Sequence, residues 1–159
     1  MIIKVKKDEI KTVSVDKAGK YVVELVGERA RVEVVGRFEV GGKKRHEVEV
    51  EIRHKAENTE ANMDIRGVVR DKAEADVRGM IKVFPGAQKT NSFLTEKVLL
   101  LSDKARAEVV PNLEIEADDV KCSHAVTVGK IDEEQLFYLM SRGLERKQAE
   151  KMIIDGFLQ

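Results

Sequence analysis

Apolar and polar residues alternate along much of the first 128 residues. The segments Arg31–Val35 and His46–Ile52 place charged and apolar side chains in turn, and Tyr21–Val26 is rich in β-branched residues. A period of two is typical of strands that bury one face and expose the other. Residues 1–129 are therefore predicted to form a β domain, in which residues 1–20 could be an irregular start.

Glycine and proline separate these predicted strands at Gly19, Gly27, Gly41-Gly42 and Pro85-Gly86. The Gly41-Gly42 pair follows Phe38–Val40 and precedes another strand, a pattern that indicates a hairpin.

Two internal repeats suggest how the strands are arranged. Asp64–Val69 recurs twelve residues later as Asp76–Ile81, and Asp71–Val77 recurs at an offset of 32 as Asp103–Val109. Recurring short strands are typical of stacked rungs, in which each rung buries its apolar face only against its neighbours. The repeats favour a right-handed β-helix, with a rolled β-sandwich as the alternative, over a closed barrel.

The pattern becomes helical after Gly129, so residues 130–159 are predicted to form a C-terminal helical segment. Asp132–Gln135 resembles a capping box, and Leu136, Leu139 and Met140 fall on one helical face. Gly143 is placed to end this helix. A second helix is predicted over 145–154, with Ala149, Met152 and Ile153 on one stripe and Gly156 as its stop. The pair could cap the β stack, bind a partner, or do both.

Composition narrows the class of protein. The chain has 159 residues, with 29 acidic and 29 basic side chains, so no net field favours nucleic acid or anionic lipid. One cysteine excludes an internal disulfide, and neither a signal peptide nor a membrane-spanning apolar run is present. We therefore expect a cytoplasmic protein. Since no phosphate-binding or dinucleotide-binding motif occurs, we also expect that it is not an enzyme.

Cys122 and His124 are the candidate site for a soft metal. Residues two apart on a strand point to the same side, so these side chains could share one ion. Val126 and Val128 continue the same face, which equally fits an inward, apolar row with Cys122 as a packing residue. An iron–sulfur cluster or a closed zinc site takes four ligands, so a second chain or exogenous thiols would have to complete it. A nucleophilic Cys122 with His124 as base is a weaker alternative.

His46 and His54 flank a single predicted strand, and we expect them to be rim or turn residues. They would lie roughly 27 Å apart, too far to bind one ion.

Six segments follow one another along the chain: His54–Thr59, Val83–Thr90, Leu99–Asp103, Pro111–Ile115, Asp118–His124 and Asp132–Tyr138. Together they resemble the SufB/SufD family, the scaffold proteins of the SUF iron–sulfur cluster assembly machinery. The resemblance covers roughly residues 20–159 and implies a right-handed β-helix followed by C-terminal helices.

The resemblance also implies partners. Such proteins pair through their β-helices as a SufB–SufD heterodimer or a homodimer, and their C-terminal helices bind SufC, an ABC-type ATPase. By position, Cys122 and His124 are the candidate ligands of a transient iron–sulfur cluster shared with the partner chain. The helical segment matches the ATPase-binding region, with these candidate contacts: Leu136, Phe137, Met140, Met152, Ile153 and Phe157.

Three departures qualify the resemblance. Thr95 stands at the position of a SufB-type cysteine, and Ala125 stands where SufB-type sequences have a glutamate. Both make the chain more SufD-like. The chain is also much shorter than other members, as expected of a compact variant, a fragment or a short paralogue. The alternative function is therefore a structural or regulatory dimer that binds no cluster.

Overall fold

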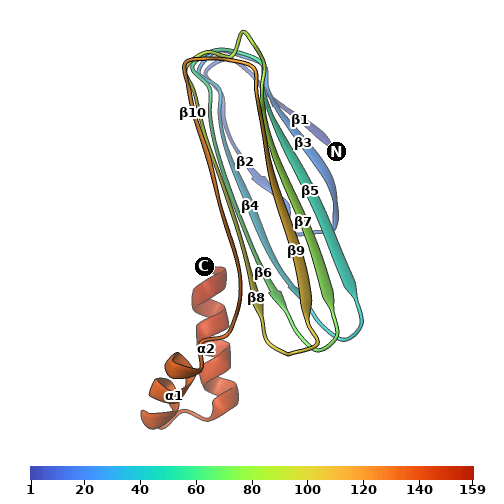
Figure 1. Cartoon of the computed structure of the whole chain (residues 1–159). Helices are drawn as coiled ribbons and strands as arrows, with labels where there is room; N and C mark the ends of the chain where they lie inside the picture. Colours follow the sequence, from blue (N-terminus) through green and yellow to red (C-terminus); the bar gives the residue numbers. More distant parts are fainter.

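The computed structural model describes residues 1–159 as a two-layered β stack whose strands run from top to bottom in Figure 1, with a helix pair at the lower ends of the strands. Ten strands precede two helices: β1 (Ile2–Val5), β2 (Ile10–Ser14), β3 (Gly19–Leu25), β4 (Arg31–Val40), β5 (Arg45–His54), β6 (Glu60–Val69), β7 (Glu74–Val83), β8 (Thr90–Leu100), β9 (Arg106–Ile115), β10 (Val120–Lys130), α1 (Glu133–Ser141) and α2 (Arg146–Leu158).

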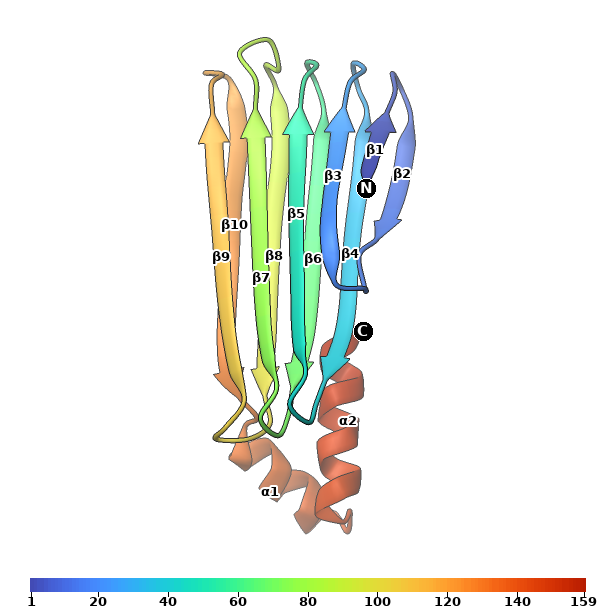
Figure 2. The same ribbon diagram turned by 90° about the vertical axis from the view of Figure 1, so that its right-hand side faces the viewer.

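The strands divide by number between two sheets. The odd sheet has the order β1-β3-β5-β7-β9 and the even sheet the order β10-β8-β6-β4-β2. Every strand pairing is parallel. The chain therefore winds as a β-solenoid in which each turn gives one strand to each sheet (Figure 2). The predicted β-helix core with a C-terminal helix pair is confirmed, and the rolled β-sandwich is not formed.

The two sequence repeats have different structural meanings. The offset of 32 is a stacking period, because Glu74 of β7 lies beside Arg106 of β9. The offset of twelve is not, because Asp64 lies on β6 in the even sheet and Asp76 on β7 in the odd sheet. This shorter repeat therefore relates two consecutive strands that lie in opposite sheets.

Two local predictions differ from the structure. Residues 1–20 contain β1 and β2, which add a short parallel strand to each sheet. The Gly41-Gly42 pair makes no hairpin, because β4 and β5 belong to different sheets. It forms a corner of the solenoid, where Gly42 has a φ of 72°, a left-handed conformation that glycine adopts without steric cost.

Apolar side chains from both sheets fill the space between them. A single cluster of 27 buried residues runs through this interior. Gly79 makes room for these side chains, because a Cβ atom at this position would lie 2.5 Å from Leu94 Cδ1 and 2.6 Å from Glu96 Oε1 and force them to shift. On the outer faces, ion pairs join neighbouring rungs, such as Lys20 with Glu49 and Lys82 with Glu114. Burial inside and charge pairing outside therefore both favour in-register stacking.

The helix pair follows β10 directly. The Asp132 carboxylate accepts hydrogen bonds from the N–H groups of Glu134 and Gln135 and so caps α1, while Gly143, with a φ of 95°, ends it as predicted. The reciprocal capping box lies instead at Glu145 and Gln148 of α2.

The prediction for α2 was partly wrong. The helix continues to Leu158, past Gly156, and its buried residues are Ala149 and Ile154, whereas Met152 is exposed. Neither helix is long and apolar enough to cross a membrane.

Candidate functional site

The last rung, formed by β9 and β10, leaves one end of the stack uncovered. β10 pairs only with β8, and β9 pairs only with β7. Four residues of β10 lie beside inward residues of β8 and therefore share their orientation: Cys122 beside Ser92, His124 beside Leu94, Val126 beside Glu96, and Val128 beside Val98. The β8 residues are buried, whereas Val126 and Val128 are 37% and 42% exposed. The inward row of the solenoid thus becomes a surface at this end.

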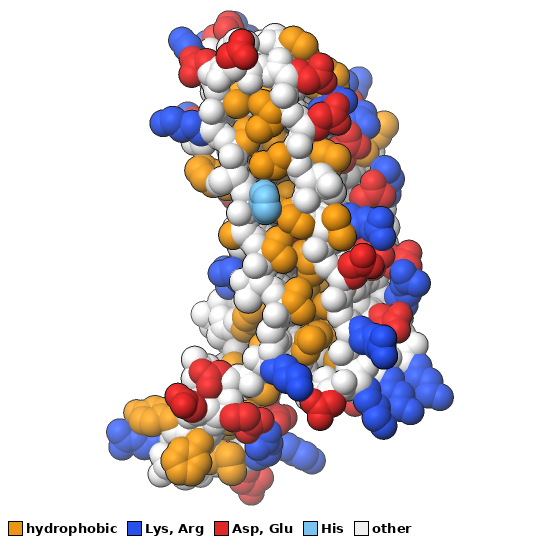
Figure 3. Space-filling model, in the orientation of Figure 1, with side chains coloured by type: hydrophobic (Ala, Val, Ile, Leu, Met, Phe, Trp, Pro, Cys, Tyr) orange, Lys and Arg blue, Asp and Glu red, His pale blue; other side chains and the backbone are white.

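The inward row of β9 is uncovered in the same way. Leu113 and Ile115 lie beside buried Ile81 and Val83 of β7, yet they are 37% and 42% exposed. Figure 3 shows the resulting apolar stripe along the stack, with a histidine within it. We call this surface, formed by the inward residues of β9 and β10, the open end. Large exposed apolar patches mark interaction sites, and long free strand edges favour pairing with another chain.

The opposite end of the stack is shielded. Its strands β1 and β2 have only four and five residues, and the Asp16 carboxylate accepts a hydrogen bond from the backbone N–H of Arg37 at 2.8 Å. The Phe38 ring stacks on His46 with centroids 4.0 Å apart and so covers the interior beyond β2. The two ends therefore differ, and only the open end exposes two full-length strands.

The structure brings Cys122 and His124 to the same side of β10, as predicted. Cys122 is half-buried against the core, and this burial raises the pKa of its thiol above the usual value. The protonated thiol is a poor nucleophile, which argues against a thiol-dependent enzyme. No group of three or more His, Cys, Asp or Glu side chains in the chain could hold a metal ion.

Thr95, which the resemblance aligns with a SufB-type cysteine, lies on the other face of the even sheet. It alternates with buried Leu94 and Glu96 on β8 and has Asp64 and Ala125 as its outward neighbours. Thr95 is therefore not placed to join Cys122 and His124 within one chain.

A buried polar network lies directly beneath Cys122. His54 is fully buried, with Nδ1 at 2.8 Å from the Thr59 hydroxyl and Nε2 at 3.0 Å from the hydroxyl of Ser92, the β8 neighbour of Cys122. Burial lowers the pKa of His54 to about 4, so the ring is neutral at pH 7. The prediction that His54 is a rim or turn residue was wrong, because its side chain points into the stack.

A second interior group, Glu96, was missed by the sequence analysis. It is fully buried beside Val126, and neither carboxylate oxygen has a hydrogen-bond partner. Burial raises its pKa to about 8, so Glu96 is mostly uncharged at pH 7. The sequence of β8 could have revealed that Glu96 points inward, because Glu96 lies two residues from each of the apolar residues Leu94 and Val98 and so shares their side of the strand.

The helix pair forms a separate exposed surface. A groove between α1 and α2 is lined by Asp132, Glu134, Gln135, Tyr138, Leu139, Met152 and Ile153. The predicted contact residues divide by exposure: Phe137 is 75% exposed, Met152 54% and Met140 41%, whereas Leu136 is fully buried. Ile153 and Phe157 are half-buried. Leu136 is therefore not accessible to a partner.

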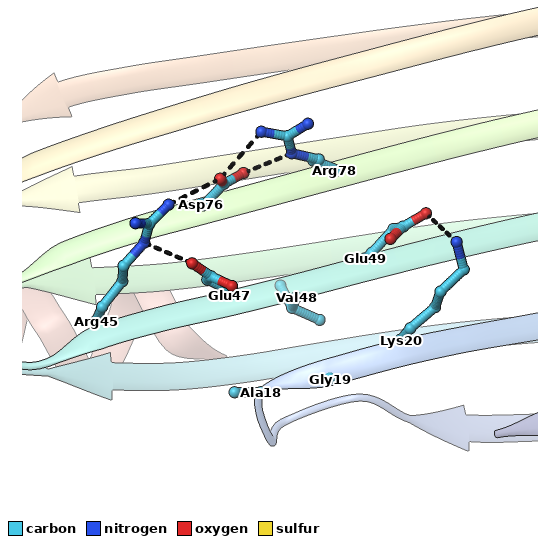
Figure 4. A pocket seen from close by; sticks show the side chains of 9 residues that line it. All are labelled: Ala18, Gly19, Lys20, Arg45, Glu47, Val48, Glu49, Asp76 and Arg78. Carbon is cyan, nitrogen blue, oxygen red and sulfur yellow. Dashed lines mark hydrogen bonds and ion pairs between the residues drawn. The ribbon is translucent and has the colours of Figure 1, made fainter.

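A charged hollow on the odd sheet has a different character. Its side chains include Arg45, Glu47, Asp76 and Arg78, which form ion pairs with one another (Figure 4). Lys20 and Glu49 form a further pair beside them. With its charges paired internally, this hollow offers no free ligand set for a metal.

Comparisons with known proteins show which family this chain resembles. A family model described as "SUF system FeS cluster assembly, SufBD core domain" matches residues 5–157. The iron–sulfur cluster assembly protein SufD of Bacillus subtilis is 40% identical over 125 residues, 79% of this chain and 28% of that protein.

Two further relatives match shorter stretches. SufD of Escherichia coli is 49% identical over 90 residues, 57% of this chain and 21% of that protein. An iron–sulfur cluster assembly SufBD family protein of Pyrococcus horikoshii is 43% identical over 94 residues, 59% of this chain and 21% of that protein. The chain spans about a quarter of the length of these curated relatives.

Proposed function

This chain belongs to the SufB/SufD family, and we propose that it is a SufD-like scaffold subunit that assembles iron–sulfur clusters in the cytoplasm and catalyses no reaction of its own. The relatives named as SufD or SufBD family proteins support the pathway. The Thr95 and Ala125 positions support the SufD-like assignment.

The open end is the observation that carries the proposal. It combines a free apolar stripe with the two candidate ligands, Cys122 and His124, on one strand. A partner that covers this stripe, either a second copy or a SufB-like subunit, would bring its own ligands to the same place. Since a cluster takes four protein ligands, two subunits could supply what one chain lacks.

The helix pair is the proposed docking site for a SufC-type ABC ATPase. The exposed side chains of Phe137, Met140 and Met152 and the groove between the helices offer apolar contacts. Aromatic and methionine side chains are common at the centres of protein interfaces. In this proposal, the open end and the helix pair are two separate contact surfaces.

Anaerobic reconstitution with iron and sulfide, in the presence of the purified ATPase, tests the cluster role. We expect wild type to acquire the visible absorption of a cluster and the Cys122→Ser/His124→Ala variant to lose it. Ser123→Ala is the matched control, because Ser123 lies between the two ligands on the exposed, outward side of β10. Equal cluster content in wild type and the double variant contradicts the ligand role.

The alternative is a structural or regulatory dimer without a cluster. The half-buried, protonated Cys122 supports it, because packing alone explains that residue. Under this alternative, Cys122→Ala lowers the unfolding temperature and leaves pairing intact, and wild type acquires no cluster absorption.

A further inference from the structure

The last turn of α2 ends against two arginines on the outer face of the even sheet. Arg37 of β4 donates from Nε to the carbonyl oxygen of Leu158 at 2.8 Å, and Arg66 of β6 donates from Nη1 to that of Phe157 at 3.0 Å. The last carbonyls of a helix have no partner within the helix. The sheet therefore supplies the cap for the C-terminal end of α2, which Figure 2 shows beside the end of β4.

Asp64 holds both guanidinium groups in place. Its carboxylate accepts from Arg37 Nη2 at 2.6 Å and from Arg66 Nε at 3.2 Å. Arg37 Nη1 also donates to the backbone carbonyls of Gly36 and Asp64. Because the sheet fixes the arginine side chains, little of their conformational entropy remains to be lost when the helix end binds.

The positive charges on this face exceed what Asp64 alone can neutralise. Arg37, Arg66 and Lys97 stand side by side on three successive rungs, and like charges in such positions repel. The C-terminal end of a helix carries partial negative charge, and the last turn of α2 contains no basic residue of its own. The two arginines therefore compensate the helix end from outside.

The chain contains a natural comparison on its other sheet. Asp76 and Arg78 of β7 repeat the spacing of Asp64 and Arg66, and Arg78 binds Asp76 through Nε and Nη2. Arg78 is 53% exposed and binds no helix carbonyl, whereas Arg66 is 27% exposed. The same short motif is thus a surface ion pair on the odd sheet and a helix cap on the even sheet.

We propose that Arg37, Asp64 and Arg66 form a clamp that positions the helix pair as a strap across the even sheet. The helix pair follows β10, a strand of the last rung, and the end of α2 is hydrogen-bonded to β6 and β4. A displacement of the helices is therefore passed to three strands of that sheet. The clamp is polar and partly solvated, and α2 buries only Ala149 and Ile154, so the strap can detach without exposing a large apolar surface.

The clamp gives the proposed ATPase docking site a defined orientation, and only this consequence rests on the proposed function. If a bound ATPase moved the helix pair, the displacement would be transmitted to β4 and β6 through the end of α2. It would also be transmitted to β10, because β10 leads directly into α1.

Hydrogen exchange of the full chain tests the clamp without any partner. We expect Arg37→Ala/Arg66→Ala to accelerate exchange of the α2 amides at least tenfold, while β6 and β8 exchange as in wild type. Arg78→Ala is the matched control, since it removes the same motif where no helix is bound, and it should leave α2 unchanged. Unaltered α2 exchange in the double variant overturns the proposal.

Arg66→Lys provides a milder variant if the double variant unfolds. It keeps the positive charge but cannot contact Asp64 and the Phe157 carbonyl together through a planar fork. Faster exchange confined to α2 supports the clamp, and wild-type exchange overturns it. ATPase binding, measured separately, should persist in these variants. A wild-type chain that binds no ATPase contradicts the docking proposal and leaves the clamp result standing.

Discussion

Single residues inside the stack determine how it responds to pH. Glu96 has a raised folded-state pKa of about 8 because it is buried without a partner. An acid of this kind favours folding most at low pH, and the stabilisation is lost as the pH rises from the unfolded value through the folded pKa. His54 has the opposite effect: its lowered pKa of about 4 weakens the fold as the pH falls below about 6.5.

Replacing Glu96 should therefore change the pH dependence of stability in a predictable direction. Between pH 6.5 and 8, we expect the unfolding free energy of wild type to fall by roughly 2 kcal/mol through this group. Glu96→Gln keeps the shape and removes the ionisation, so its stability should be flatter over that range in chemical denaturation. Exposed Glu74 provides the control, because Glu74→Gln should retain the wild-type slope. Parallel slopes for wild type and Glu96→Gln contradict the prediction.

At the residue scale, sequence reasoning identified exposed chemistry better than interior chemistry. Cys122 and His124 could be placed on one side of a strand because the period of two is a local property. The partners of His54 could not, because Thr59 and Ser92 lie five and 38 residues away along the chain. Such contacts depend on the stacking register, which two partial repeats do not specify.

Among the elements, the two helices differ in how far their roles could be read from the sequence. The start and end of α1 follow from Asp132 and Gly143, whose local effects are strong. The helix α2 continues past Gly156, and two arginines more than 90 residues upstream bind carbonyl groups of its last turn. Tertiary contacts there outweigh the low helix propensity of glycine.

The exposed groove of the helix pair allows the proposed ATPase docking to be tested by a single substitution. Met152→Asp should abolish capture of a purified SufC-type ATPase, because it places a charge in the apolar groove. Met152 is 54% exposed, so we expect the variant to fold. Lys147→Asp is a matched control on α2, since Lys147 lies outside this groove and faces Glu39 and Arg70. Undiminished capture by Met152→Asp, with circular dichroism unchanged, would reject docking at the groove.

For the whole molecule, the free apolar stripe predicts association. Val128→Glu puts a charge on the inward row of the open end, whereas Thr127→Glu puts the same charge on the outer face beside Lys97. Light scattering coupled to gel filtration should show that Val128→Glu halves the mass of the dimer and that Thr127→Glu does not. A SufB-like subunit should be tested in parallel. Equal masses for the three proteins contradict pairing between two copies through the open end.

The stacked-strand architecture could be predicted from the sequence, but the positions of individual strands in the two sheets could not. Alternation indicated strands, and the offset of 32 matched the stacking of β9 on β7. The offset of twelve suggested a second stacking period that does not exist, because the two similar strands, β6 and β7, follow one another in the chain but lie in different sheets. Local patterns cannot distinguish neighbours along a sheet from neighbours across it. The pattern alone left a rolled β-sandwich as an alternative, and the resemblance to a known family favoured the β-helix.

The difference between the two ends of the stack limits how these molecules can assemble. A solenoid with matching exposed ends could add subunits head to tail without limit, as a fibre does. Here the first end carries short strands, Asp16 and the stacked Phe38 and His46 rings. If two copies pair through their open ends, as we propose, both of these surfaces are covered and neither can bind a third copy, so we expect a closed pair and not a fibre.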